Sequence, residues 1–166
     1  MEKIEINIKS EDIYNRLYSE SGSTSLSRTA MGLPDALAEL IQITEDDKRV
    51  VDGYITSSVN EVSHTISRYL SPCSVRRIYD ETLKANKYNL TFSLPDNYPQ
   101  ECTGMLEDTI IDVVKNRTMQ YWSLIVKPDE ANIQATKVQS DVGRLRELLA
   151  MRSYPCTHDY ITEQQL

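Results

Sequence analysis

The longest regular pattern of apolar and polar positions begins at Thr44 and ends at Leu70. Its apolar residues recur at steps of three, four and one, which predicts a single stripe along one long helix. The stripe consists of Val51, Tyr54, Ile55, Val59, Val62, Ile66, Tyr69 and Leu70. Thr44 and Asp47 have the spacing of a capping box, and acidic residues at 45–47 lie where the helix dipole favours negative charge. Pro72 is expected to stop the helix, because proline cannot donate a backbone hydrogen bond. A helix of this length spans about 40 Å, so other helices must cover its stripe.

Two further helical stripes follow in the second half of the chain. The first consists of Leu106, Ile110, Val113, Val114, Tyr121, Leu124 and Ile125, and the second of Ile133, Val138, Val142, Leu145, Leu148 and Leu149. Lys127-Pro128-Asp129 separates them by a short connection, which predicts two antiparallel helices. Arg117 lies within the first of these stripes. We expect it to form an ion pair with Asp52 or Glu61 of the long helix.

Two segments alternate strictly between apolar and polar residues, which is typical of strands. Residues 3–8 place Ile4, Ile6 and Ile8 on one face, and residues 88–94 do the same with Tyr88, Leu90, Phe92 and Leu94. These two strands are too far apart in the sequence to form a local hairpin. We expect them to pair with each other or with strands of a neighbouring subunit. The stretch 73–87 between the long helix and the second strand is poorly patterned and could contain a short helix.

The ends of the chain show weaker patterns. Residues 10 to about 22 predict a helix with Ile13 and Leu17 inward, and the Ser/Gly/Thr-rich stretch 21–28 predicts a mobile loop. A short helix is expected from Leu33-Pro34-Asp35 to Ile41 or Ile43, with Leu37, Leu40 and Ile41 inward. The sequence therefore predicts a mainly α fold: a bundle of three long helices with shorter N-terminal helices and a small two-stranded β element. Its parts are an N-terminal region 1–43, a helical core 44–152 that contains the strand 88–94, and a flexible tail 153–166.

Composition narrows the functional classes. The 166 residues fit one domain, and the net charge of -7 argues against a chain that wraps DNA or RNA, since such binding depends on Lys and Arg. The one local basic excess, Arg76, Arg77, Lys84 and Lys87, is diluted by acidic neighbours. Cys73, Cys102 and Cys156 lack CxxC spacing, and no signal peptide or membrane-spanning apolar run is visible. These features predict an intracellular protein with reduced thiols. The ten tyrosines fit either the edges of a small core or an interface.

No group of residues carries an obvious chemistry. His64 lies off the long helix's stripe, which predicts a solvent-facing or interfacial side chain, and His158 lies in the tail. Cys156-Thr-His158-Asp159 lacks the second pair of ligands that a structural zinc site needs. The sequence contains no nucleophile elbow, phosphate loop or dinucleotide fingerprint, and acidic groups such as Glu107/Asp108 fit solvated helix positions. We therefore expect no catalytic, cofactor-binding or metal-binding residue.

The order of these elements resembles the head–tail connector (head-completion adaptor) family of tailed bacteriophages. The likeness covers Thr44 to Pro155. It rests on the acid-capped helix with Tyr54-Ile55, the second helix with Tyr121-Trp122, and a last helix ending in Leu148-Leu149 before Arg152 and Tyr154-Pro155. The N-terminal 43 residues and the pronounced strand 88–94 depart from the family pattern.

This resemblance implies a non-enzymatic virion protein, assembled in the bacterial cytoplasm, that forms a ring below the portal and extends the DNA channel. Its partners would be further copies of itself and portal or tail proteins. DNA would only pass through, and no membrane or small-molecule substrate is implied. Two alternatives remain: a helical protein-binding or regulatory adaptor of a cellular complex, and a small enzyme whose site the sequence does not reveal.

Overall fold

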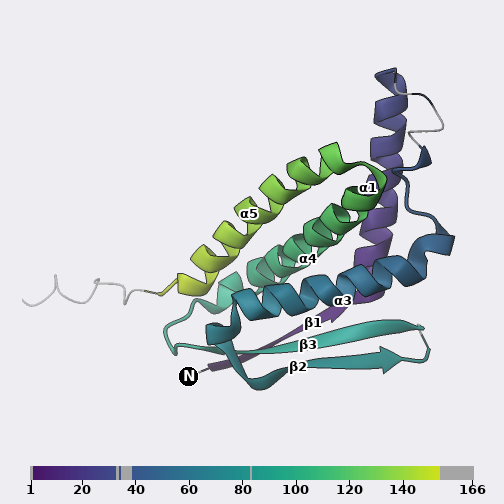
Figure 1. Cartoon of the computed structure of the whole chain (residues 1–166). Helices are drawn as coiled ribbons and strands as arrows, with labels where there is room; N and C mark the ends of the chain where they lie inside the picture. Colours follow the sequence, from purple (N-terminus) through teal and green to yellow (C-terminus); the bar gives the residue numbers. More distant parts are fainter. Residues whose placement is uncertain (1, 33, 35–38, 83, 154–166) are drawn as a thin grey trace, which may run out of the picture.

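The computed structural model describes residues 2–32, 34, 39–82 and 84–153, which form a mainly helical fold with one antiparallel sheet (Figure 1). The elements are β1 Glu2–Lys9, α1 Ser10–Ala30, α3 Lys48–Thr65, β2 Leu70–Asp80, β3 Ala85–Leu94, α4 Thr103–Val126 and α5 Pro128–Ala150. Short 3₁₀ turns cover Glu45–Asp47, Ser67–Tyr69 and Gln100–Cys102. The described residues thus contain four long helices, not the three that were predicted.

The pairing predicted between the two alternating strands is confirmed. β1 runs antiparallel to β3, with Ile6 opposite Leu90 and Ile8 opposite Tyr88. All four of these side chains are buried, because the alternation places them on the face that the helices cover. The N-terminal strand therefore contributes to the same hydrophobic core as the helices.

The sheet has a third strand that the sequence pattern did not indicate. β2 pairs antiparallel with β3, so that the strand order is β1-β3-β2 and both outer strands lie at edges. The prediction of a two-stranded element, and of a short helix within 73–87, was wrong. β2 lacks alternation because Val75, Ile78 and Tyr79 are all exposed, so along residues 75–79 neither face of the strand is covered by the core. Pairing with β3 determines its conformation instead.

The long helix is shorter than its apolar stripe. A 3₁₀ turn precedes α3, which ends at Thr65 instead of Leu70. The Asp47 half of the predicted capping box is formed, since Asp47 Oδ2 accepts the Thr44 N–H at 2.9 Å and the Thr44 hydroxyl at 2.7 Å. Ile66 stays buried beyond the helix, and Leu70 already pairs with Phe92 of β3. The final part of the stripe therefore faces the core from a turn and a strand.

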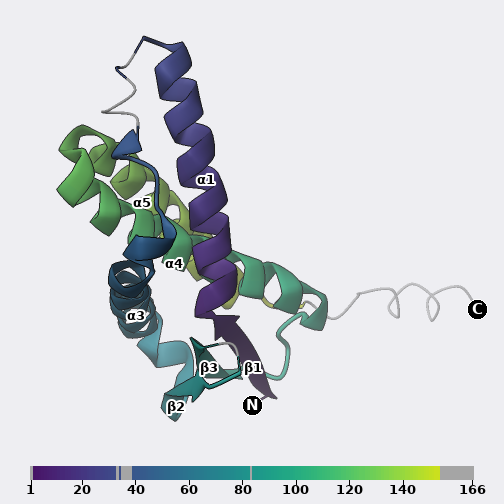
Figure 2. The same cartoon turned by 90° about the vertical axis from the view of Figure 1, so that its right-hand side faces the viewer.

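The first helix is longer than predicted. α1 continues to Ala30, so the segment 21–28 is helical and not a mobile loop. Ser21 is fully buried, and its Oγ accepts the Ile43 N–H at 3.0 Å. This small side chain lets the residues before α3 pack closely against α1. The second half of α1 projects beyond the other helices (Figures 1 and 2).

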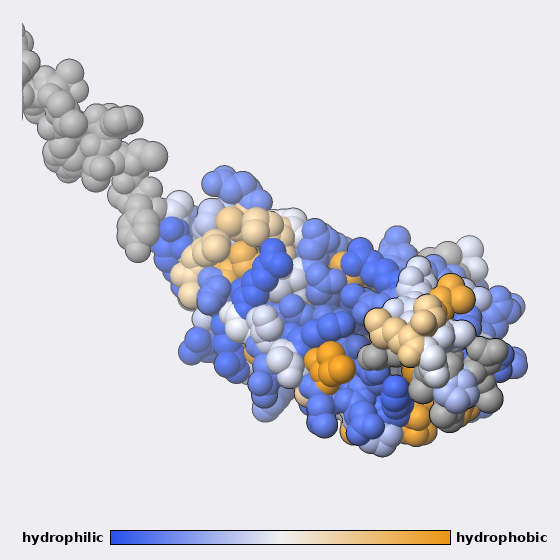
Figure 3. All heavy atoms as spheres, turned by 90° about the horizontal axis from the view of Figure 1, so that it is seen from above, coloured by the Kyte–Doolittle hydropathy of each residue, from blue (hydrophilic) through white to orange (hydrophobic). Residues whose placement is uncertain are grey.

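The helices form layers on one face of the sheet. α3 and α4 lie next to the sheet, and α5 packs on α4 as the antiparallel partner that the short connection at Lys127 predicted (Figure 1). Hydrophobic side chains also remain exposed at the end from which α1 projects (Figure 3). Leu124, Ile125 and Ile133 belong to this exposed set, so their prediction as inward-facing stripe residues was wrong. The apolar stripes of α4 and α5 extend beyond the part of each helix that its neighbours cover.

Two expectations concern segments that the structure describes only in part. Part of the short helix expected between Leu33 and Ile43, including Leu37, lies outside the described residues. Of its described residues, Ile41 is buried as predicted, whereas Leu40 is exposed. The tail is described only at Ser153, whose backbone N–H donates to the Asn97 carbonyl at 2.7 Å.

Candidate functional site

One polar cluster joins α3 to α4. Arg117 Nε donates to Glu61 Oε2 at 2.6 Å, and the Tyr121 hydroxyl donates to Glu61 Oε1. This confirms the predicted ion pair and selects Glu61, not Asp52, as the partner of Arg117. The Tyr54 ring stacks on Tyr121 with ring centres 5.7 Å apart. Burial raises the pKa of Tyr121, and the Glu61 carboxylate raises it further, so the phenol stays protonated and donates at neutral pH.

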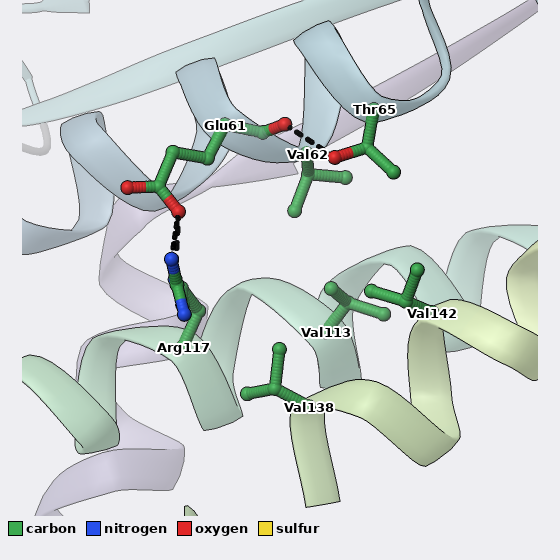
Figure 4. Close-up of a pocket in the computed structure, with 7 residues that line it drawn as sticks. All are labelled: Glu61, Val62, Thr65, Val113, Arg117, Val138 and Val142. Carbon is green, nitrogen blue, oxygen red and sulfur yellow. Dashed lines mark hydrogen bonds and ion pairs between the residues drawn. The ribbon is translucent and has the colours of Figure 1, made fainter. Parts of the chain in front are cut away.

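A small hollow lies beside this cluster, between α3, α4 and α5 (Figure 4). Its apolar lining is Val62, Val113, Val138 and Val142, and the Glu61–Arg117 pair lies at its margin. Its volume is about 150 Å³, whereas sites for metabolites usually enclose about 300–1,000 Å³. The hollow has room for one side chain or a few waters. We therefore interpret the Glu61–Arg117–Tyr121 cluster as a link between helices.

A second polar cluster joins α3 to the sheet. The hydroxyls of Thr56 and Tyr88 are 2.7 Å apart, and Thr56 also donates to the Asp52 carbonyl at 2.9 Å. Burial raises the pKa of Asp52, although the nearby Lys48 ammonium opposes this change. Asp52 Oδ1 is buried and accepts no hydrogen bond from any described residue. The carboxylate thus carries an unfavourable desolvation that the Lys48 ammonium offsets only in part.

The residues that the sequence singled out for chemistry do not form a reactive group. His64 is exposed near the end of α3, as predicted. Cys102 is a free, partly buried thiol whose Sγ lies 3.8 Å from the Met151 sulfur. The tail candidates Cys156 and His158 lie outside the described residues. Among the residues that the structure describes, no three His, Cys, Asp or Glu side chains are arranged to hold a metal ion.

The sequence reasoning missed a larger hollow, which we call the acidic–apolar hollow. It is lined by Glu39, Leu40, Gln42, Thr44, Asp47, Trp122, Ile125 and Val126, and its volume is about 370 Å³. Leu40 is 56% exposed and Ile125 is 68% exposed. The Trp122 indole N–H donates to the Ile41 carbonyl at 3.0 Å, which fixes the segment before α3 against α4. The hollow could not be found from one periodic pattern, because its residues come from separate segments.

A second exposed surface, the β2 basic edge, consists of Val75, Arg76, Arg77, Ile78 and Tyr79. Ile78 is 48% exposed and Tyr79 is 58% exposed. Both arginines are exposed. The sequence had indicated the basic excess here but not that it lies on an edge strand. Edge strands can pair with or pack against another chain.

Comparisons with known proteins give no further guidance, since no protein-family model, curated protein or solved structure matches this chain. Within the described residues, no helix combines the length and the apolar composition needed to span a bilayer.

Proposed function

We propose that this chain is a non-enzymatic structural protein of a tailed-phage virion, a head–tail connector that assembles as a ring below the portal. One observation carries the proposal: two unlike exposed surfaces on a single chain. The acidic–apolar hollow lies at the start of α3 and the end of α4, and the β2 basic edge lies on the sheet. Contacts between two different surfaces of identical subunits produce rings when the rotation closes.

Charge and topology support this proposal. The net charge of -7 suits a channel wall that DNA passes without binding, because phosphates are repelled by acidic surfaces. The sheet leaves β1 and β2 as edges, which a neighbouring subunit can cover. The resemblance of residues 44–155 to connector proteins adds the specific location below the portal.

Electron microscopy and analytical ultracentrifugation of the full chain at increasing concentration test the proposal. We expect closed rings with one predominant copy number and a central channel. A chain that stays monomeric at about 1 mM, where even a weak contact worth about 4 kcal/mol is half formed, contradicts ring assembly. Binding of one cellular partner at a fixed 1:1 ratio would favour the adaptor alternative.

A further inference from the structure

We infer that the β2 basic edge of one copy docks on the acidic–apolar hollow of a second copy of this chain. The inference rests on the proposed self-assembly and specifies which surfaces meet. It follows from the chemistry of the two surfaces, which are complementary in both charge and polarity.

The hollow has both apolar and acidic lining. Leu40, Trp122 and Ile125 supply the apolar part, and Glu39 and Asp47 supply the acidic part. Glu45 and Asp46, next to Asp47 in the same 3₁₀ turn, are exposed and extend the negative charge. A fitting partner therefore presents an apolar side chain next to a cation.

The β2 basic edge has that composition. Arg76 and Arg77 precede Ile78 and Tyr79, so each face of the strand carries one cation two residues before one apolar side chain. None of these four side chains is covered by the core of its own chain. Neither arginine forms an ion pair with another residue that the structure describes, which leaves both charges available.

The two surfaces cannot meet within one molecule. The hollow is built by the start of α3 and the end of α4, on the helical side of the molecule, whereas β2 lies in the sheet (Figures 1 and 2). β2 is also held to β3 by its backbone ladder. The contact must therefore form between copies. If each copy contacts two others, the assembly grows head to tail, whereas a reciprocal contact gives a dimer.

Charge reversal tests this contact on the full chain. The variant R76E/R77E and the variant E45K/D46K should each raise the concentration of half-assembly by about tenfold or more, because like charges then face each other. Combining all four substitutions in one chain should restore assembly to within about threefold of the original protein. Asp47 is left unchanged because it caps the turn before α3. The control R144E/R146E makes the same change in net charge as R76E/R77E, at exposed positions of α5 outside both surfaces, and should have little effect.

The readout is analytical ultracentrifugation, with circular dichroism to verify that each variant is folded. Rings that form equally well in every variant overturn the inferred contact but leave the proposed function standing. A charge-dependent dimer, lost in each reversal and restored by their combination, supports the contact and contradicts the ring. A chain that stays monomeric at about 1 mM overturns both.

Discussion

The clearest prediction concerns the N-terminal strand, whose membership of the core can be tested with one substitution. Ile6 is 1% exposed and lies opposite Leu90 in the sheet. The substitution Ile6→Ala removes three buried carbon atoms, at about 0.8 kcal/mol each for lost transfer free energy. The cavity left behind adds to this, and buried isoleucine-to-alanine changes usually cost about 2–5 kcal/mol. We expect the free energy of unfolding to fall by about 3 kcal/mol.

Urea denaturation followed by tryptophan fluorescence provides the assay, since the chain has a single tryptophan, the buried Trp122. With a slope near 2 kcal/mol per molar urea, the midpoint should fall by about 1.5 M. The matched control is Asn7→Ala, the next residue on the exposed face of the same strand, which should change stability by less than about 0.5 kcal/mol. If Ile6→Ala and Asn7→Ala unfold at the same urea concentration, β1 is not part of the core and our account of the sheet is wrong.

Three further predictions concern polar contacts. Glu61→Gln should lower the pKa of Tyr121 towards its ordinary value, seen by ultraviolet absorbance titration, and reduce stability by about 1 kcal/mol. An unchanged titration would show that the carboxylate does not act on the phenol. Burial raises the pKa of Asp52. The protonated Asp52 carboxyl therefore contributes favourably to the free energy of folding below the unfolded-state pKa, and this contribution is lost as pH rises through the folded-state pKa. Asp52→Asn should therefore stabilise the protein by about 0.5–1 kcal/mol at pH 7. Urea denaturation at pH 7 and pH 4 should show this gain shrinking in acid, and a gain that is equal at both values would contradict the assignment. Trp122→Phe removes the hydrogen bond to the Ile41 carbonyl and should cost about 1–3 kcal/mol in thermal unfolding, with faster amide exchange around residue 42. Unaltered exchange there would mean that the indole does not hold this segment.

The surfaces that we assign to assembly were only partly predictable. The sequence identified Arg76 and Arg77 as a basic excess, but their placement on an exposed edge strand depends on the pairing of β2 with β3. The acidic–apolar hollow brings Leu40 and Ile125 together from segments far apart in the chain. Ile125 belonged to a helical stripe that predicts burial, and its exposure follows from where the covering helices end. An ion pair of Arg117 with Asp52 or Glu61 was predicted because a cation inside an apolar stripe needs an acidic partner on the facing helix, and the structure selects Glu61.

The sequence by itself determined those elements that bury one face. The alternation around Ile6 and Phe92 and the stripes of α3, α4 and α5 are periodic, because each element presents one side to the core. Only the tertiary structure decided the conformation of β2, which is exposed on both faces along residues 75–79, and of the second half of α1, where poor helix formers are held in place through the buried Ser21. Such segments carry no period of their own, since the free energy that fixes them comes from contacts with distant parts of the chain.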